Sequence, residues 1–130
     1  MKTLLLVAGG RGGSDFFQGL LDGHTQILSF PLYLKIDDNF IQILNEKNPE
    51  KLAKQFINFV PEIFNSKINK FERYHRLGKN RNKHFKVSKK KFIQSFVNLN
   101  KSKKFDNFNK LKFLHYAYSI SKGEILKKKK

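Results

Sequence analysis

A glycine-rich stretch near the start of the chain constrains the possible folds most strongly. Residues 4–7 form an unbroken apolar run, LLLV, and the turn after it has glycines at positions 9, 10, 12 and 13 around Arg11. From Ser14 onward, apolar residues recur at helical spacing. This order predicts a buried strand, a loop and a helix N-terminus, where free backbone N–H groups attract an anion. The stretch therefore predicts a phosphate-binding loop.

Three familiar types of nucleotide loop fit the residues poorly. A Walker-type loop has a lysine before its final Ser or Thr, whereas Gly13 precedes Ser14 here, so an ordinary ATP or GTP site is disfavoured. A dinucleotide fingerprint requires a third glycine where this chain has Asp15. The segment AGGRGG is also similar to the opening of sugar-nucleotide nucleotidyltransferases, whose pattern continues with a basic residue in place of Ser14-Asp15. We rank that interpretation lowest.

Residues 4–31 as a whole resemble the 5′-phosphosulfate loop of the sulfotransferase family. The usual form of that loop is R-S-G-T-T-L-L-x-x-L-L-x-x-H-P after an apolar strand, and the match is ungapped. The matching positions are Arg11, Gly13, Leu20-Leu21 and His24, and Ser14 stands at the first Thr. The chain departs from the pattern at Gly12 for Ser, Asp15 for the second Thr, Phe16-Phe17 for the Leu pair and Thr25 for Pro.

The resemblance implies transfer of a sulfuryl group from 3′-phosphoadenylyl sulfate to a hydroxyl or amine acceptor, on a small molecule or a glycan. The implied cofactor-binding residues are Arg11, Gly12, Gly13, Ser14, Asp15 and Phe16. Asp15 would repel the cofactor if its carboxylate pointed inward; alternatively, it faces away and stabilises the first helical turn. No catalytic base is identified, because His24 suits a capping or packing role better.

The resemblance also implies an α/β fold of the P-loop nucleoside-kinase-like type in one domain over residues 1–130. Residues 1–31 would form the strand, phosphosulfate loop and helix, and residues 32–130 a helical region with a basic second half. No second parallel strand is visible, and Arg81 and Ser88 have only a loosely similar spacing to the family's 3′-phosphate ligands. We therefore expect a truncated sulfotransferase domain, mostly helical after its first unit, that need not be active by itself.

Besides one short helical stretch within residues 66–87, apolar periodicity and capping residues predict four helices after residue 36. They cover residues 37–46, 49 to about 65, 89–99, and about 105 to 121. Asn48 and Ser88 are the expected caps of the second and third, and Pro61 should kink the second or end it early. The apolar stripes are expected to be core: Leu52, Phe56, Phe59, Val60 and Ile63; Phe92, Phe96 and Leu99; and Phe108, Leu111, Leu114, His115 and Tyr118.

The charge of the chain is strongly uneven. The formal net charge is +17, and residues 67–130 hold 21 basic and 3 acidic residues, which by itself suggests nucleic-acid binding. However, 23 of the 27 basic residues are lysines, whereas phosphate and base recognition favours the planar fork of arginine. We therefore expect solvated lysines rather than nucleic-acid recognition. A non-enzymatic basic helical module that binds RNA or another polyanion is the alternative function.

The remaining composition argues against several classes of site. The chain has no cysteine, so it has no disulfide or thiolate–metal framework, and its four histidines lack a metal-ligand spacing. No apolar stretch approaches the ~18 residues that a membrane span requires. The short run at residues 1–8 ends in glycines and an arginine rather than in a cleavage site, so we expect a cytoplasmic protein without a signal peptide.

Overall fold

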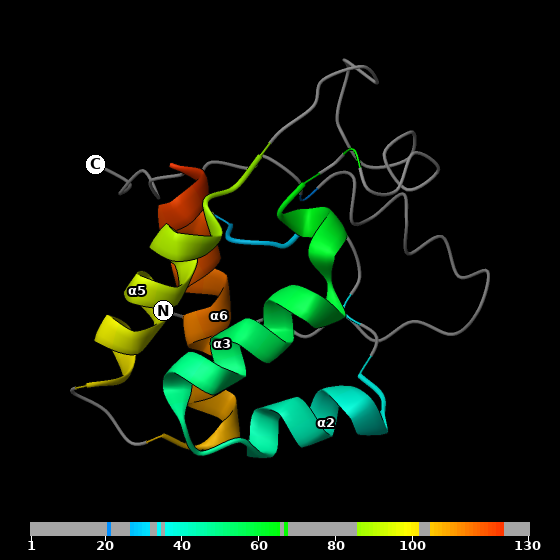
Figure 1. Ribbon diagram of the computed structural model, residues 1–130, viewed down its shortest axis with the longest axis vertical. Coiled ribbons are helices and arrows are strands. Elements are labelled where there is room, and N and C mark those ends of the chain that lie inside the picture. Colours follow the sequence, from blue (N-terminus) through cyan, green and yellow to red (C-terminus); the bar gives the residue numbers. More distant parts are fainter. Residues whose placement is uncertain are drawn as a thin grey trace.

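The computed structural model describes residues 21, 27–31, 34, 36–65, 67, 86–101 and 105–123. These residues form α-helices and one 3-10 turn, and they contain no sheet (Figure 1). The elements are α2 (Asp38–Asn45), α3 (Pro49–Phe59), η1 (Pro61–Ile63), α5 (Lys89–Asn100) and α6 (Asn107–Lys122). A single antiparallel bridge, between Asn65 and Lys86, joins extended residues within the described ranges.

The predicted α/β fold of the nucleoside-kinase-like type is therefore wrong, since the part of the chain that the structure describes is helical. Apolar residues from Phe40 onward recur at intervals of three and four, which suits one buried face of a helix rather than a strand. The extended segment 27–31 ends at Pro31, which has no N–H to donate to a strand ladder. The strand expected at residues 4–7 lies outside the described residues.

Helices α2, α3, α5 and α6 each begin at a residue whose side-chain oxygen caps the helix. In every case the oxygen accepts a hydrogen bond from a backbone N–H three residues later, which would otherwise lack a partner inside the helix. The pairs are Asp37 with Phe40, Asn48 with Lys51, Ser88 with Lys91, and Asp106 with Asn109. The caps predicted at Asn48 and Ser88 are confirmed.

A proline and a glycine explain where α3 and α6 end. Helix α3 stops at Phe59 rather than near residue 65, and Pro61 begins the separate turn η1, so the early end expected from this proline is confirmed. Gly123 follows α6 with a φ of 83°, the left-handed conformation in which a side chain is strained. Its N–H donates back to the carbonyl oxygen of Ile120.

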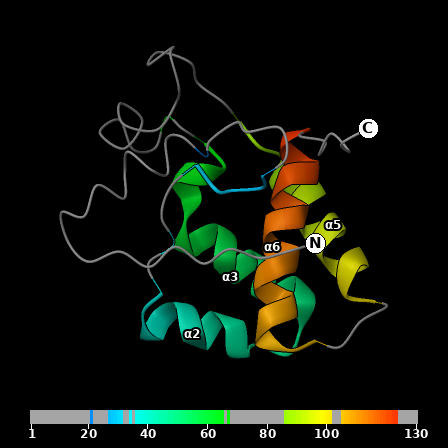
Figure 2. The same ribbon diagram turned by 180° about the vertical axis from the view of Figure 1, so that it is seen from behind.

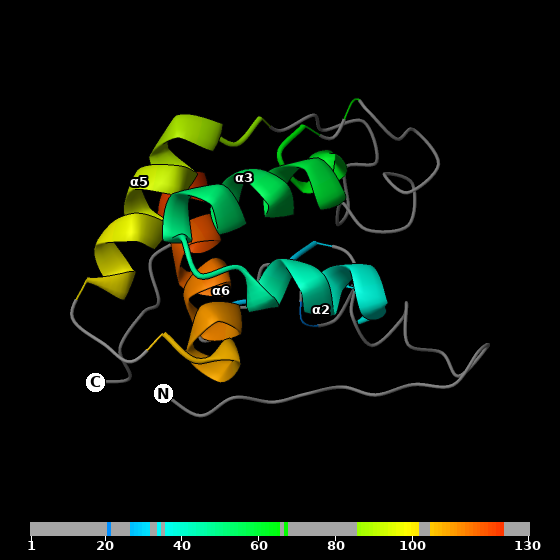
Figure 3. The same cartoon turned by 60° about the horizontal axis from the view of Figure 1, so that its bottom comes forward.

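The helices form two antiparallel hairpins that pack on each other. Helices α2 and α3 run side by side in opposite directions (Figure 3), and so do α5 and α6 (Figure 1). Helix α3 packs against α5, and α2 packs against α6, so each hairpin covers the apolar faces of the other. The core lies between the two hairpins.

Aromatic rings dominate this core. Seven of the ten phenylalanines that the structure describes are buried in it: Phe30, Phe40, Phe56, Phe64, Phe92, Phe96 and Phe113. The ring of Phe56 is central, with centroids 5.5 Å from Phe30, 5.8 Å from Phe92, 6.3 Å from Phe40 and 6.4 Å from Phe64. These separations lie in the range in which tilted and edge-to-face ring pairs attract each other.

Most of the predicted apolar stripes are confirmed, but Phe108 is not part of the core. Leu52, Phe56 and Phe92 are fully buried, whereas Phe108 is 60% exposed. The buried face of α6 includes Lys110, two residues from Phe108. Two residues correspond to about 200° around a helix, so Phe108 lies on the opposite side from Lys110.

The Tyr118 hydroxyl joins α6 to η1 through the core. It donates a hydrogen bond of 2.7 Å to the carbonyl oxygen of Ile63, and the side chain of Tyr118 is 1% exposed. Tyr118→Phe should lower the free energy of unfolding by about 1–2 kcal/mol, because the buried carbonyl would lose this donor. Tyr116→Phe, at a half-buried position on the same helix, is the control and should change stability by less than about 0.5 kcal/mol in urea unfolding. Equal effects of the two substitutions would contradict this role of the Tyr118 hydroxyl.

Candidate functional site

The residues of the predicted phosphosulfate loop lie outside the described residues. They are Arg11, Gly12, Gly13, Ser14, Asp15 and Phe16, and His24 and Arg81 also lie outside. Ser88 is described, and its hydroxyl caps α5 by accepting a hydrogen bond of 3.2 Å from the N–H of Lys91. The described end of the family-like stretch is the segment 27–31.

Segment 27–31 is anchored in the core by Phe30. The Phe30 side chain is 2% exposed, and its ring centroid lies 3.9 Å from His115, 5.2 Å from Tyr118 and 5.5 Å from Phe56. We call these four residues the Phe30 cluster. Figures 1 and 2 show the segment in blue to cyan between η1 and α6. The stretch that resembles the sulfotransferase loop therefore ends against the helical core.

His115 is the ionisable imidazole of the Phe30 cluster. Its ring stacks on Phe30 with an interplanar angle of 29°, and its Nδ1 is enclosed without a hydrogen-bond partner among the described residues. Burial lowers the pKa of His115 to about 4, because the charged form would lose its hydration. At neutral pH the imidazole is therefore uncharged and only weakly basic. The packing role predicted for His115 is confirmed, and its low basicity does not favour it as a general base.

Lys110 is a buried cation that sequence reasoning missed. Its side chain is 4% exposed, and its Nζ donates a hydrogen bond of 2.6 Å to the carbonyl oxygen of Leu44 in the last turn of α2. Nζ also lies 4.3 Å from the centroid of the Phe105 ring. Burial lowers the pKa of Lys110, while Glu46 and Asp106 oppose this shift. The ammonium offsets the negative end of the α2 dipole, so the expectation of solvated lysines is wrong at this position.

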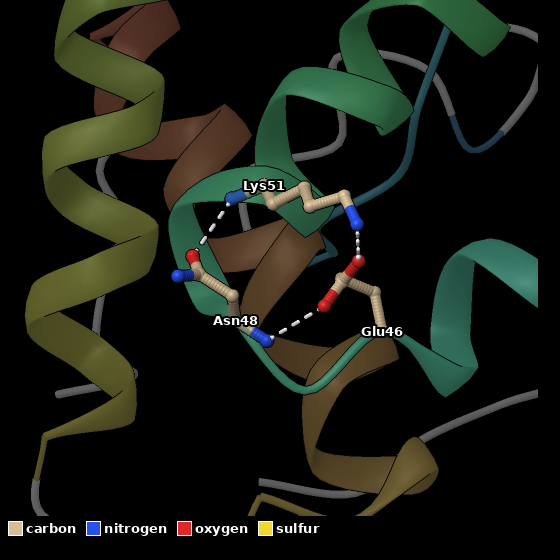
Figure 4. A network of polar contacts seen from close by, with 3 residues as sticks. All are labelled: Glu46, Asn48 and Lys51. Carbon is tan, nitrogen blue, oxygen red and sulfur yellow. Dashed lines mark hydrogen bonds and ion pairs between the residues drawn. The ribbon is translucent and has the colours of Figure 1, made fainter.

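The connection between α2 and α3 contains a small polar network (Figure 4). The Glu46 carboxylate lies 2.8 Å from Lys51 Nζ and accepts a hydrogen bond of 3.0 Å from the N–H of Asn48. The side-chain hydrogen bond from Lys51 is the main cause of a lowered pKa of Glu46, and the Asn48 N–H adds to it. All these groups serve the turn and the start of α3. Their arrangement is therefore structural.

The described lysines of α5 face solvent. Lys89, Lys90 and Lys91 are exposed in the first turn of that helix, where the dipole disfavours cations. No arginine lies within the ranges that the structure describes. Over these ranges there is therefore no arginine whose planar guanidinium could bind a phosphate or a base edge. The exposed cations are lysines.

Neither the described residues nor the comparisons with known proteins identify a metal site, a membrane-spanning helix or a family. Within the described ranges, no group of three His, Cys, Asp or Glu side chains is placed to hold a metal ion. No described helix has the length and apolar character needed to cross a membrane. No family model, curated protein or solved structure matches the chain.

Proposed function

We propose that this chain binds 3′-phosphoadenylyl sulfate and acts in the transfer of its sulfuryl group to a hydroxyl or amine acceptor. The observation that carries the proposal is the ungapped resemblance of residues 4–31 to the phosphosulfate loop, with Arg11, Gly13 and His24 at matching positions and Ser14 at the first Thr. An apolar run, glycines, one guanidinium and a helical pattern in that order also form an anion-binding sequence on physical grounds alone.

The loop residues suit the chemistry of the transfer. The acceptor oxygen or nitrogen forms a bond to sulfur while the bond from sulfur to the phosphate oxygen breaks, and negative charge grows on the departing phosphate. The backbone N–H groups of residues 12–16 and the Arg11 guanidinium would stabilise that charge. The proton of the acceptor passes to a base whose identity this proposal leaves open.

The Phe30 cluster supports the proposal through the position of segment 27–31. This segment continues the resemblance beyond His24, and its Phe30 ring is held by rings from α3 and α6. A catalytic loop needs a rigid neighbour so that its donors stay aligned with a ligand. The aromatic core provides such an anchor at the downstream end of the stretch.

Binding of adenosine 3′,5′-bisphosphate tests the proposal. This nucleotide is what remains of the donor after its sulfuryl group has been transferred. Arg11→Ala should weaken binding by about 2 kcal/mol, or about thirtyfold, because paired charge-assisted hydrogen bonds to phosphate are lost. The control Lys91→Ala removes an exposed cation and should cost less than about 1 kcal/mol. Isothermal titration calorimetry measures both.

Two outcomes would contradict the phosphosulfate assignment. One is the absence of binding to the wild-type chain, and the other is equal affinity of wild type and Arg11→Ala. The alternative function, a basic module for RNA or another polyanion, predicts a different pattern. RNA affinity would then fall steeply with salt and would decrease with successive lysine substitutions on α5 and α6 rather than with Arg11→Ala.

A further inference from the structure

The stack of Phe30 on His115 joins an extended segment to a helix through an ionisable ring. The ring centroids are 3.9 Å apart, and His115 Nδ1 is enclosed without a hydrogen-bond partner among the described residues. A neutral imidazole can be packed in this way at modest cost. A protonated one would hold a full charge away from water, and its Nδ1–H would have no acceptor among the described residues, which is far more costly.

Among the described residues, no charged partner faces His115, and the Phe30 ring attracts a cation more weakly than the hydration that burial removes. Segment 27–31 carries no ionisable side chain, and its contact is the Phe30 ring. Tyr118 directs its hydroxyl to the carbonyl oxygen of Ile63. No charged group of α3, η1, α5 or α6 within the described residues contributes to the pKa shift of His115, which is caused by burial. The free-energy cost of protonating the ring is therefore lowered when the ring moves into water.

We propose that the Phe30–His115 stack is a proton-sensitive latch, which holds segment 27–31 on the helical core while the imidazole is neutral and releases it when the imidazole is protonated. The latch concerns the contact between this segment and α6. It does not depend on what the chain binds, so it stands or fails separately from the phosphosulfate proposal.

The expected size of the response follows from proton linkage. The latched ring takes up a proton only near its pKa of about 4, whereas a released histidine has the ordinary pKa of about 6.5. The ratio of released to latched segment should then rise by about thirtyfold from pH 7.5 to pH 5.0. Most of the increase should fall below about pH 6.5, where the released histidine begins to bind protons.

Limited proteolysis of the full chain with thermolysin tests the latch. This protease cuts before large apolar residues that are not followed by proline, so the bonds before Ile27 and Leu28 report release of the segment. Cleavage at these bonds should accelerate about thirtyfold from pH 7.5 to pH 5.0, relative to a synthetic peptide of residues 25–33 at each pH. His115→Phe keeps an aromatic partner but cannot be protonated, and its cleavage should change less than about threefold.

Two further measurements keep the result interpretable. The cleavage rate should depend weakly on urea, since releasing one segment exposes little surface, whereas global unfolding depends on it steeply. The NMR titration of the His115 ring in the wild-type chain should give a pKa near 4. The proposal is overturned by an equal pH response in His115→Phe, by a urea dependence equal to that of global unfolding, or by an ordinary pKa of His115.

Discussion

Phe56→Ala is expected to lower the free energy of unfolding by about 4 kcal/mol, the largest effect of any single substitution considered for this protein. Phe56 is fully buried in the middle of α3, and its ring packs against those of Phe30, Phe40, Phe64 and Phe92. Alanine would leave a cavity bordered by rings from both hairpins and from segment 27–31. Those rings are fixed by other contacts, so the cavity would collapse only partly.

Phe108→Ala is the matched control for this prediction. It makes the same chemical change at a position that is 60% exposed, and it should alter stability by less than about 0.5 kcal/mol. Urea unfolding followed by far-ultraviolet circular dichroism measures both variants. A loss below about 1 kcal/mol for Phe56→Ala would show that Phe56 is not at the centre of a packed core.

Acidification is expected to destabilise the folded chain by about 3 kcal/mol through His115 alone. The folded-state pKa of His115 is about 4, below its ordinary value of 6.5. Above about pH 6.5 the ring is neutral in both states, so the full stability is present. As the pH falls from 6.5 to 4, the unfolded chain gains a proton that the folded chain excludes, and stability is lost. Each pH unit in that interval is worth about 1.4 kcal/mol.

The His115→Phe variant isolates this contribution from those of the other titrating groups. The wild-type chain and the variant should differ in their loss of unfolding free energy between pH 7.5 and pH 4.0 by about 3 kcal/mol, with the larger loss in the wild type. Urea unfolding at the two pH values provides the four free energies required. Identical losses in the two chains would mean that His115 is hydrated in the folded state.

Segment 27–31 connects the two proposals in the chain. It continues the stretch that resembles the phosphosulfate loop, and its Phe30 ring is held by the helical core. If both proposals hold, acid would loosen the anchor that follows the loop in the chain and should weaken binding of adenosine 3′,5′-bisphosphate. The two remain separable, because Arg11→Ala tests the ligand and His115→Phe tests the latch.

The local helical structure was predictable from short-range chemistry. The helix starts at residues 49 and 89 follow from side-chain oxygens of Asn48 and Ser88 that satisfy an N–H three residues away. The early end of α3 follows from Pro61 in the same way. Such contacts span three or four residues, so the sequence by itself determined them, together with the apolar stripes on α3 and α5.

Contacts between distant residues decided the rest. The expected sheet is absent from the described residues because their apolar faces are buried by helix hairpins. Lys110 lies four residues before Leu114 and eight residues before Tyr118. This spacing alone puts Lys110 on the same face of the helix as those two residues. That it is buried depends on the carbonyl oxygen of Leu44, brought to it from 66 residues away. The stack of His115 on Phe30 likewise exists only once α6 meets segment 27–31. Periodicity shows which residues share a face, but the tertiary partner determines which face is buried and which charge is removed from water.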